Sequence, residues 1–342
     1  MGFGRDVRMN AAQRAAVLLA ERLEVATAAV GQRVSLDPQA VLDRSGDIAL
    51  GQPGPASPNG HCRMLAAVDG WIALNLARPS DVELVPAWIG AETRDDPWQA
   101  ACGHAAVTPV AQLIEMGALL GLPIAGVGEV KDGSLSPALV TMGAGGLTTP
   151  VPQVIDLSSL WAGPLCGAIL AAMGAQVMRI EDQARPDPTR VTTPGHFARL
   201  NQGKRELRVP FGTEAGRARL WAMACDADII ITSARPRAFG SLGLDPARLF
   251  TANPRLIWVA ITGQGFTGER AGRVAFGDDA AAAGGLVRWV EGAPHFLGDA
   301  LADPLTGMAA ALATIPAMQA GGGVLVDAAM ASVAAGAARM GS

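Results

Sequence analysis

The sequence predicts an α/β fold with a doubly wound, mostly parallel sheet. Three observations predict it: short apolar runs typical of buried strands, helical periodicity between those runs, and glycines at the expected helix ends. Residues 154–180 show all three, because two apolar runs there flank a segment with helical spacing. A strand, a helix and a second parallel strand, joined by a right-handed crossover, explain this pattern.

The first strand of this unit is predicted at residues 154–157, before two serines. A turn at Gly163-Pro164 precedes the helix, and Gly174 ends it where a C-terminal glycine is expected. Residues 176–180 form the second strand. Ligands of open α/β sheets bind beyond the carboxyl ends of the strands. The residues expected there after the first strand are Ser158, Trp161, Ala162 and Gly163.

The same alternation continues toward the C-terminus. A helix is predicted at residues 214–224, with strands at residues 228–232 and 256–261. Apolar stretches near residues 165–178 and 309–318 are interrupted by Gly, Gln or Pro before they reach transmembrane length. We therefore expect both stretches to be core helices.

The N-terminal part of the chain begins with an Ala-rich segment. Residues 10–30 predict a helix that packs through one side. The apolar residues expected on that side are Val17, Leu18, Leu23 and Val25. Residues 51–60 contain three prolines and three glycines, which indicates a loop at a domain boundary.

A β-hairpin is predicted after this loop. Asp69-Gly70 separates two apolar runs, which is typical of a tight turn between strands, here at residues 64–68 and 71–76. Ser80 is expected to cap the helix that follows.

Four segments result from these boundaries. Residues 133–152 are rich in Gly, Ser, Thr and Pro and predict a linker. Before it we expect an N-terminal helical segment (1–50) and a smaller α+β domain (51–132), and after it the large domain with the parallel sheet (153–342).

Composition limits the partners and the compartment. The formal net charge is −4 and 17% of the residues are charged, so neither nucleic acid nor an anionic membrane is an expected partner. Hydrophobic residues make up 50%, which favours a large buried surface such as a subunit interface. The four cysteines are scattered and the N-terminus lacks the apolar core of a signal peptide, so we expect a cytoplasmic protein.

Several short motifs follow one another in the order found in a known family. They are DLSSLWAGPLCGAILAAMGAQVMRIE, TR, NQGKR, ADIII with RP, LGL, NPRLI, ITGQG and ADPLTG. Their order resembles the family III CoA-transferases, a family that includes carnitine and formyl-CoA transferases and, on the same fold, α-methylacyl-CoA racemase. The resemblance covers nearly all of residues 151–342. It implies a Rossmann-like sheet and a homodimer.

The hairpin after the loop also resembles this family, but in an unexpected position. In the family such a hairpin belongs to the smaller domain, which follows the catalytic half, whereas here it comes first. The chain therefore resembles either a rearranged member or a piece of a longer fused one.

The resemblance implies a nucleophilic aspartate near the start of an Ala-rich helix. Alignment on residues 284–286 puts the family aspartate nearest Gly277, so Asp278 matches after one deletion and Asp279 is second choice. A carboxylate suits CoA transfer because it attacks a thioester, forms a mixed anhydride and then takes up CoA as an aspartyl thioester. The alternative structural role is a helix cap.

The remaining site residues would bind CoA, which is a substrate here, so no cofactor or metal is expected. Basic residues expected at the CoA phosphates are Arg190, Lys204, Arg205 and Arg235. Gly263, Gly265 and Gly277 would donate N–H groups to the tetrahedral oxyanion, and Gln264 belongs to the same substrate loop.

Two alternative functions stay open. A racemase of acyl-CoA needs a base on each face of the α-carbon, and Asp303 in the ADPLTG motif resembles one of the racemase bases. The racemases also have a histidine where this chain has Gly277. The second alternative is a non-catalytic CoA-binding or scaffolding subunit. For a transferase, the partners would be an acyl-CoA and a carboxylic acid.

Overall fold

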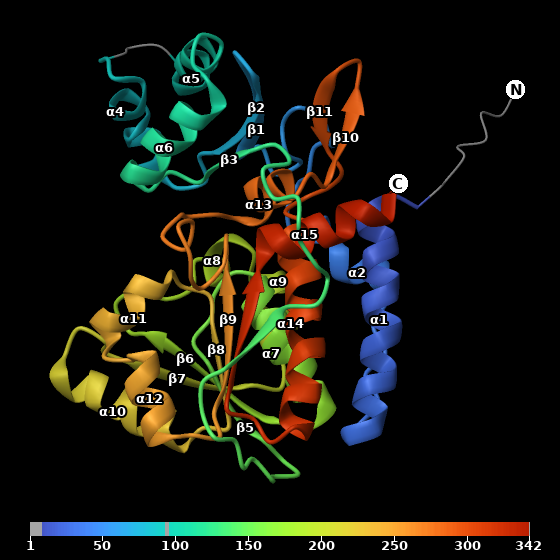
Figure 1. Ribbon diagram of the computed structural model, residues 1–342, viewed down its shortest axis with the longest axis vertical. Helices are drawn as coiled ribbons and strands as arrows, with labels where there is room; N and C mark the ends of the chain where they lie inside the picture. The colour runs from blue at the N-terminus through green and yellow to red at the C-terminus, as the bar shows by residue number, and fades with distance from the viewer. Residues whose placement is uncertain (1–8, 93–95, 342) are drawn as a thin grey trace, which may run out of the picture.

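The computed structural model describes residues 9–92 and 96–341, so residues 1–8 of the N-terminal segment lie outside the description (Figure 1). The helices are α1 (Ala11–Val30), α2 (Pro38–Leu42), α3 (Pro79–Glu83), α4 (Val85–Ile89), α5 (Pro97–Ala105), α6 (Val110–Leu120), α7 (Ala162–Met173), α8 (Thr189–Thr192), α9 (Pro194–Asn201), α10 (Glu214–Asp226), α11 (Pro236–Leu242), α12 (Pro246–Ala252), α13 (Gly277–Ala283), α14 (Ala302–Gln319) and α15 (Met330–Ala338), with a final 3₁₀ turn at Arg339–Gly341. The strands are β1 (Cys62–Ala67), β2 (Gly70–Asn75), β3 (Ile124–Gly126), β4 (Ala138–Thr141), β5 (Gln153–Asp156), β6 (Gln176–Asp182), β7 (Arg205–Val209), β8 (Ile229–Thr232), β9 (Ile257–Thr262), β10 (Val287–Val290), β11 (Ala293–Phe296) and β12 (Val324–Ala329).

The large sheet confirms the predicted fold class. Among the described residues it has seven strands in the order β4-β12-β9-β8-β5-β6-β7. β4 is antiparallel to β12, and the other neighbours are parallel. From β7 to β12 this order matches that of the Rossmann fold. The chain moves outward from β5 to β7 and returns at β8, so the strand order reverses between β5 and β8, where such sheets bind ligands.

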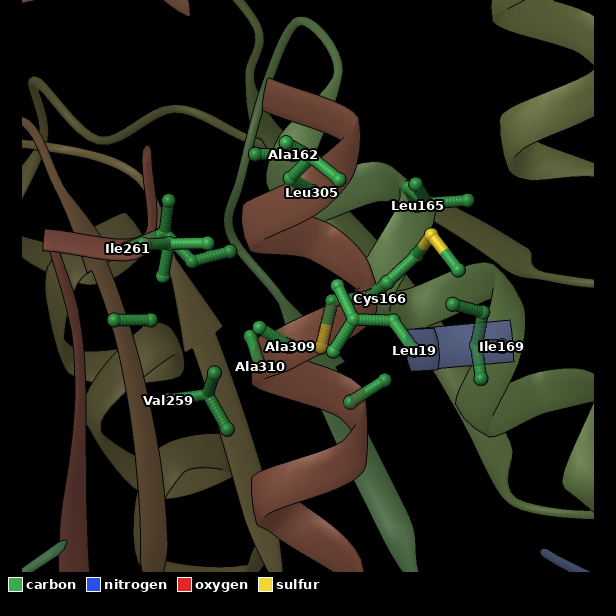
Figure 2. Packing of buried hydrophobic residues seen from close by; sticks show 14 of the residues in the cluster. Leu19, Ala162, Leu165, Cys166, Ile169, Val259, Ile261, Leu305, Ala309 and Ala310 are labelled. Atoms are coloured by element: carbon green, nitrogen blue, oxygen red, sulfur yellow. The ribbon is translucent and has the colours of Figure 1, made fainter. Parts of the chain in front are cut away.

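Both faces of the sheet are covered by helices, as a doubly wound fold requires. Successive strand residues point to opposite faces, so Ile229 and Ile231 of β8 join the core on the α7 and α14 side, whereas Ile230 joins the core formed with α10 to α12. In Figure 2, α14 lies between β9 and α7. Gly307 permits this close approach, because a Cβ there would lie 2.6 Å from the Ala162 carbonyl oxygen.

The predicted strand–helix–strand unit is confirmed at β5, α7 and β6. Gly174 ends α7 with a φ of 113°, a conformation that favours glycine. The helix starts at Ala162, so its first turn already contains Gly163 and Pro164. The strand predictions at β8 and β9 and the helix prediction at α10 are also confirmed to within two residues.

Helix α1 was predicted correctly in extent but not in its buried side. Asn10 and Gln13 form a capping box at its start. Its buried residues are mostly alanines together with Leu19, Leu23 and Thr27, whereas Val25 is 72% exposed. The prediction for Val25 was wrong because small alanines, not the larger side chains, allow α1 to lie close against α14 (Figure 1).

The segment at residues 51–132, which we call the small domain, contains the predicted hairpin, with two local differences. Ala67 pairs with Gly70, so the turn consists of Val68 and Asp69 rather than Asp69-Gly70. Helix α3 is capped at Arg78 and not at Ser80, because Pro79 occupies the first helical position, which proline favours. β3 adds a third strand, antiparallel to β2.

Two segments join the domains more closely than their sequence indicates. Residues 133–152, predicted as a linker, contain β4, which forms an edge of the large sheet. The hairpin β10–β11 follows α13 and packs on the small domain, where Phe296 joins a cluster with Cys62 and Met64. In Figure 1 this hairpin stands beside β1 and β2, and α13 lies between the sheet and the small domain.

Membrane-spanning helices and clustered metal ligands are both absent from the described residues. Within residues 9–92 and 96–341, no helix is long and apolar enough to cross a membrane. The same residues contain no group of three or more His, Cys, Asp or Glu side chains that would hold a metal ion.

Candidate active site

A cavity of about 340 Å³ lies where the strand order reverses, at the carboxyl ends of β5, β8 and β9. Ser159 follows β5, Ser233 follows β8 and Gly263 follows β9, and all three line it. Arg78 lines it from the small domain. In Figure 1 the tips of β9 and β12 point toward α13 and the small domain. The other lining residues follow the strands and helices of the large sheet, so the cavity lies where Arg78 of the small domain meets them.

The backbone at the switch point is tightly constrained. The Ser159 N–H donates to Ser233 Oγ at 3.0 Å, which joins the turns after β5 and β8. Leu160 has a φ of 68°, and its N–H donates to Asp187 Oδ2 at 3.0 Å. Ala300, near the same site, has a φ of 46°. Such strained residues persist where surrounding contacts fix them, commonly at functional sites.

Three guanidinium groups line the cavity, and two of them have carboxylate partners. Arg78 pairs with Asp81, and Arg273 pairs with Glu129 at 2.7 Å. The Arg235 guanidinium has no ion pair or hydrogen bond among the described residues, although the Arg235 carbonyl oxygen accepts from the Ala238 N–H. Burial, followed by the nearby charges of Arg237 and Arg78, lowers the pKa of Arg235. This guanidinium is therefore the one available for an anionic ligand.

The predicted acids differ in their access to the cavity. Asp303, in the first turn of α14, is half-buried and lines it. Asp278 and Asp279 are 2% and 0% exposed and are not among its lining residues. Burial is the main cause that raises the pKa of Asp303 to about 7, and the charge of Arg44 opposes the rise.

Asp279 caps α13. Its Oδ1 accepts from the Phe276 N–H at 2.9 Å and from Asn75 Nδ2 at 3.2 Å. Of Asp278 and Asp279, it is therefore Asp279 that has the helix-capping role given as the structural alternative. Burial raises its pKa to about 8.

Asp278 belongs to a buried polar network that connects the domains. Asn59, from the loop at residues 51–60, donates through Nδ2 to Asp278 Oδ2 at 2.7 Å and to Asp299 Oδ1 at 2.6 Å. The Ala300 N–H donates to Asp278 Oδ1 at 2.7 Å, and Arg44 pairs with Asp299. Burial raises the pKa of Asp278 to about 6 despite these donors.

The residues predicted to bind CoA fall into two groups. Ala162, Arg235 and Gly263 line the cavity. The others do not: Ser158, Trp161, Gly163, Arg190, Lys204, Arg205 and Gln264.

Several residues of the second group are engaged within the protein. Ser158 Oγ donates to Asp156, and Trp161 packs edge-on against His196. Arg190 pairs with Glu181 and Glu206, and Gln264 Nε2 donates to Glu129. Gly163 packs against Ser158, and Arg205 lies at β7, beside a different cavity near the start of β5.

Sequence reasoning missed the polar residues on the neighbouring strand tips. Ser159 and Ser233 face each other across the switch point, and Arg273 and Arg78 come from distant segments. The rule applied to the end of β5 also holds for β8 and would have found Ser233. No local signal marks Arg78 or Arg273, because the docking of the small domain brings them to the cavity.

These features define a class of protein: an α/β fold whose switch-point cavity is lined, among the described residues, by one carboxylate, Asp303, and one unpaired guanidinium, Arg235. The family model for CoA-transferase family III matches residues 152–340. The chain belongs to CoA-transferase family III.

Individual relatives support this assignment. The chain is 31% identical over 201 residues to the succinate–glutarate CoA-transferase of Agrobacterium fabrum, covering 53% of this chain and 50% of the relative. It is 32% identical over 174 residues to an acyl-CoA transferase of Fusarium pseudograminearum, covering 46% of this chain and 38% of the relative. The chain thus spans about half the length, or less, of these curated relatives.

Two solved structures have a fold similar to that of this chain. A CaiB/BaiF family protein from Brucella suis superimposes with a TM-score of 0.50 at 30% identity, covering 54% of this chain and 53% of that one. Rv3272 from Mycobacterium tuberculosis superimposes with a TM-score of 0.51 at 29% identity, covering 56% and 57%.

Proposed function

We propose that this chain transfers CoA from an acyl-CoA thioester to a carboxylic acid through an aspartyl covalent intermediate. The observation that carries the proposal is the cavity at the switch point, which holds the half-buried carboxylate of Asp303 and the unpaired guanidinium of Arg235. Membership of CoA-transferase family III supports the same chemistry.

The cavity suits an acyl-transfer step for electrostatic reasons. A carboxylate partly removed from water is a better nucleophile than a fully solvated one, because less hydration must be lost on attack. Arg235 would bind an anionic part of CoA. Gly263, at the end of β9, would donate its backbone N–H to the oxyanion that forms at the reacting carbonyl group.

The choice of acids to test follows from the relatives. Family members similar to this chain are named for succinate, glutarate, citramalate and mesaconate, which are short dicarboxylic acids. We propose this class as the first acceptors. The test is a panel of acyl-CoA donors and dicarboxylic acids, with the product CoA esters separated by liquid chromatography. A failure of transfer with every pair would overturn the proposed function.

Racemisation has less support. Asp303 would serve as one base, but the described residues that line the cavity include no second carboxylate and no histidine, lysine or cysteine. Exchange of deuterium into the α-position of an acyl-CoA without an acceptor acid would favour this alternative. CoA binding without either reaction would indicate the scaffolding role.

We propose a homodimer in a reducing cytoplasm. The low charged fraction of 17% supports a large buried interface, and all four cysteines are free. Sedimentation analysis that gives a monomer at micromolar concentration would contradict the dimer.

A further inference from the structure

We infer that Asp303, from α14, is the carboxylate that attacks the thioester, in place of the acids at the start of α13. This inference rests on the proposed function and identifies its nucleophile. Asp303 is the only carboxylate among the described residues that line the cavity. A nucleophile must come within roughly 3–3.5 Å of the carbonyl carbon, so access to the cavity is the first requirement.

The two rival acids lack this access. Asp278 is 2% exposed, and each of its oxygens accepts a hydrogen bond, one from Asn59 and one from the Ala300 N–H. Asp279 has no exposed area, and its Oδ1 is held by the Phe276 N–H. Either side chain would have to break these bonds and rotate out of the core before it reached a substrate.

Gly277, at the start of α13, leaves room for the carboxylate of Asp303, which comes from α14. A Cβ on Gly277 would lie 2.2 Å from Asp303 Oδ2 and 2.5 Å from the Ala300 carbonyl oxygen. Asp303 therefore fills the space that a side chain at residue 277 would need, and the backbone of Ala300 prevents one from being added.

Asp303 is the only protein group that forms covalent bonds in the proposed reaction, and each bond that forms is matched by one that breaks. An Asp303 oxygen bonds to the thioester carbonyl carbon and the C–S bond breaks. CoA leaves as a thiolate, and the acyl group stays on Asp303 as a mixed anhydride. The thiolate then attacks the Asp303 carboxyl carbon and expels the donor acid as a carboxylate. The acceptor carboxylate attacks the resulting aspartyl thioester, and the same two steps in reverse give the new acyl-CoA and free Asp303.

The experiment maps the covalent adduct directly. The whole chain is incubated with succinyl-CoA or acetyl-CoA and hydroxylamine without an acceptor acid, digested, and analysed by peptide mass spectrometry. We expect an aspartyl hydroxamate at Asp303 in the wild type. Asp303→Asn should lose the adduct and at least about 10³-fold of the transfer rate, whereas Asp279→Asn should keep the adduct. Circular dichroism checks that each variant is folded.

The outcomes separate this inference from the proposed function. An adduct at Asp278 or Asp279 would overturn the role of Asp303 and leave the transferase intact, as would an Asp303→Asn enzyme with wild-type turnover. No adduct with either donor, together with no transfer, would overturn both. If Asp303→Asn does not fold, the position of the adduct in the wild-type chain still decides whether Asp303 is the nucleophile.

Discussion

Lys204 Nζ lies 2.8 Å from Asp156 Oδ2, and neither side chain has any exposed area. Lys204 also donates to the Pro164 carbonyl oxygen at 2.7 Å and to Asn201 Oδ1 at 3.2 Å. All three ammonium protons thus have acceptors within the protein. Asp156 ends β5, so this ion pair fixes the strand end that leads into the switch point and leaves no Lys204 proton for a phosphate.

Lys204→Met should destabilise the fold by about 3–5 kcal/mol, because it leaves Asp156 as a buried charge without a partner. The double variant Asp156→Asn/Lys204→Met should recover most of the loss. Urea unfolding measures the free energies. The control is Arg205→Ala, an exposed neighbour, for which we expect a change within about 0.5 kcal/mol. A stable Lys204→Met single variant would contradict the role given to the pair.

Arg235→Gln should raise KM for the acyl-CoA by roughly 10-fold and leave kcat nearly unchanged, since the guanidinium binds the substrate equally before and during reaction. Steady-state kinetics at two salt concentrations measure this, and salt should weaken wild-type binding more than that of the variant. Arg237→Gln is the matched control, because Arg237 is exposed and does not line the cavity. An equal effect of both substitutions would argue for a general charge effect rather than a binding site.

Asn59→Ala should cost about 1–3 kcal/mol of stability, because Asp278 and Asp299 both lose a donor inside the protein. Asn59 also lowers the pKa of Asp278, so the loss should be larger at high pH, where Asp278 is charged. Thermal unfolding across pH measures the effect. Gln52→Ala, at an exposed position of the same loop, serves as the control. Identical pH curves for Asn59→Ala and wild type would exclude the proposed contact.

Asp279→Asn should flatten the pH dependence of stability. Burial raises the pKa of Asp279 from 3.8 to about 8 in the folded state, so the folded chain holds a proton that the unfolded chain loses. Stability therefore falls as pH rises from about 4 through about 8. Asn at position 279 does not titrate and still caps α13, so its midpoint temperature should decline less over this interval. Parallel curves for the two proteins would show that Asp279 does not contribute.

Much of the large domain was predictable because its signals are local. The apolar run of β5, the helical spacing of α7 and the glycine at position 174 lie within one short segment, and each acts through neighbours in sequence. β4 was missed because all four of its residues are exposed and it pairs with β12 near the end of the chain. The extended conformation of β4 depends on its pairing with β12, which no local pattern in the sequence reveals.

The sequence by itself determined the doubly wound, mostly parallel sheet, its first strand–helix–strand unit and the presence of acids at the start of α13. Only the tertiary structure decided which carboxylate faces the cavity. Asn59 and Asn75 from the small domain hold Asp278 and Asp279 inside the protein, while the absence of a side chain at Gly277 gives the space to Asp303. Burial and access arise from the packing of segments far apart in the chain, so spacing along the sequence does not encode them.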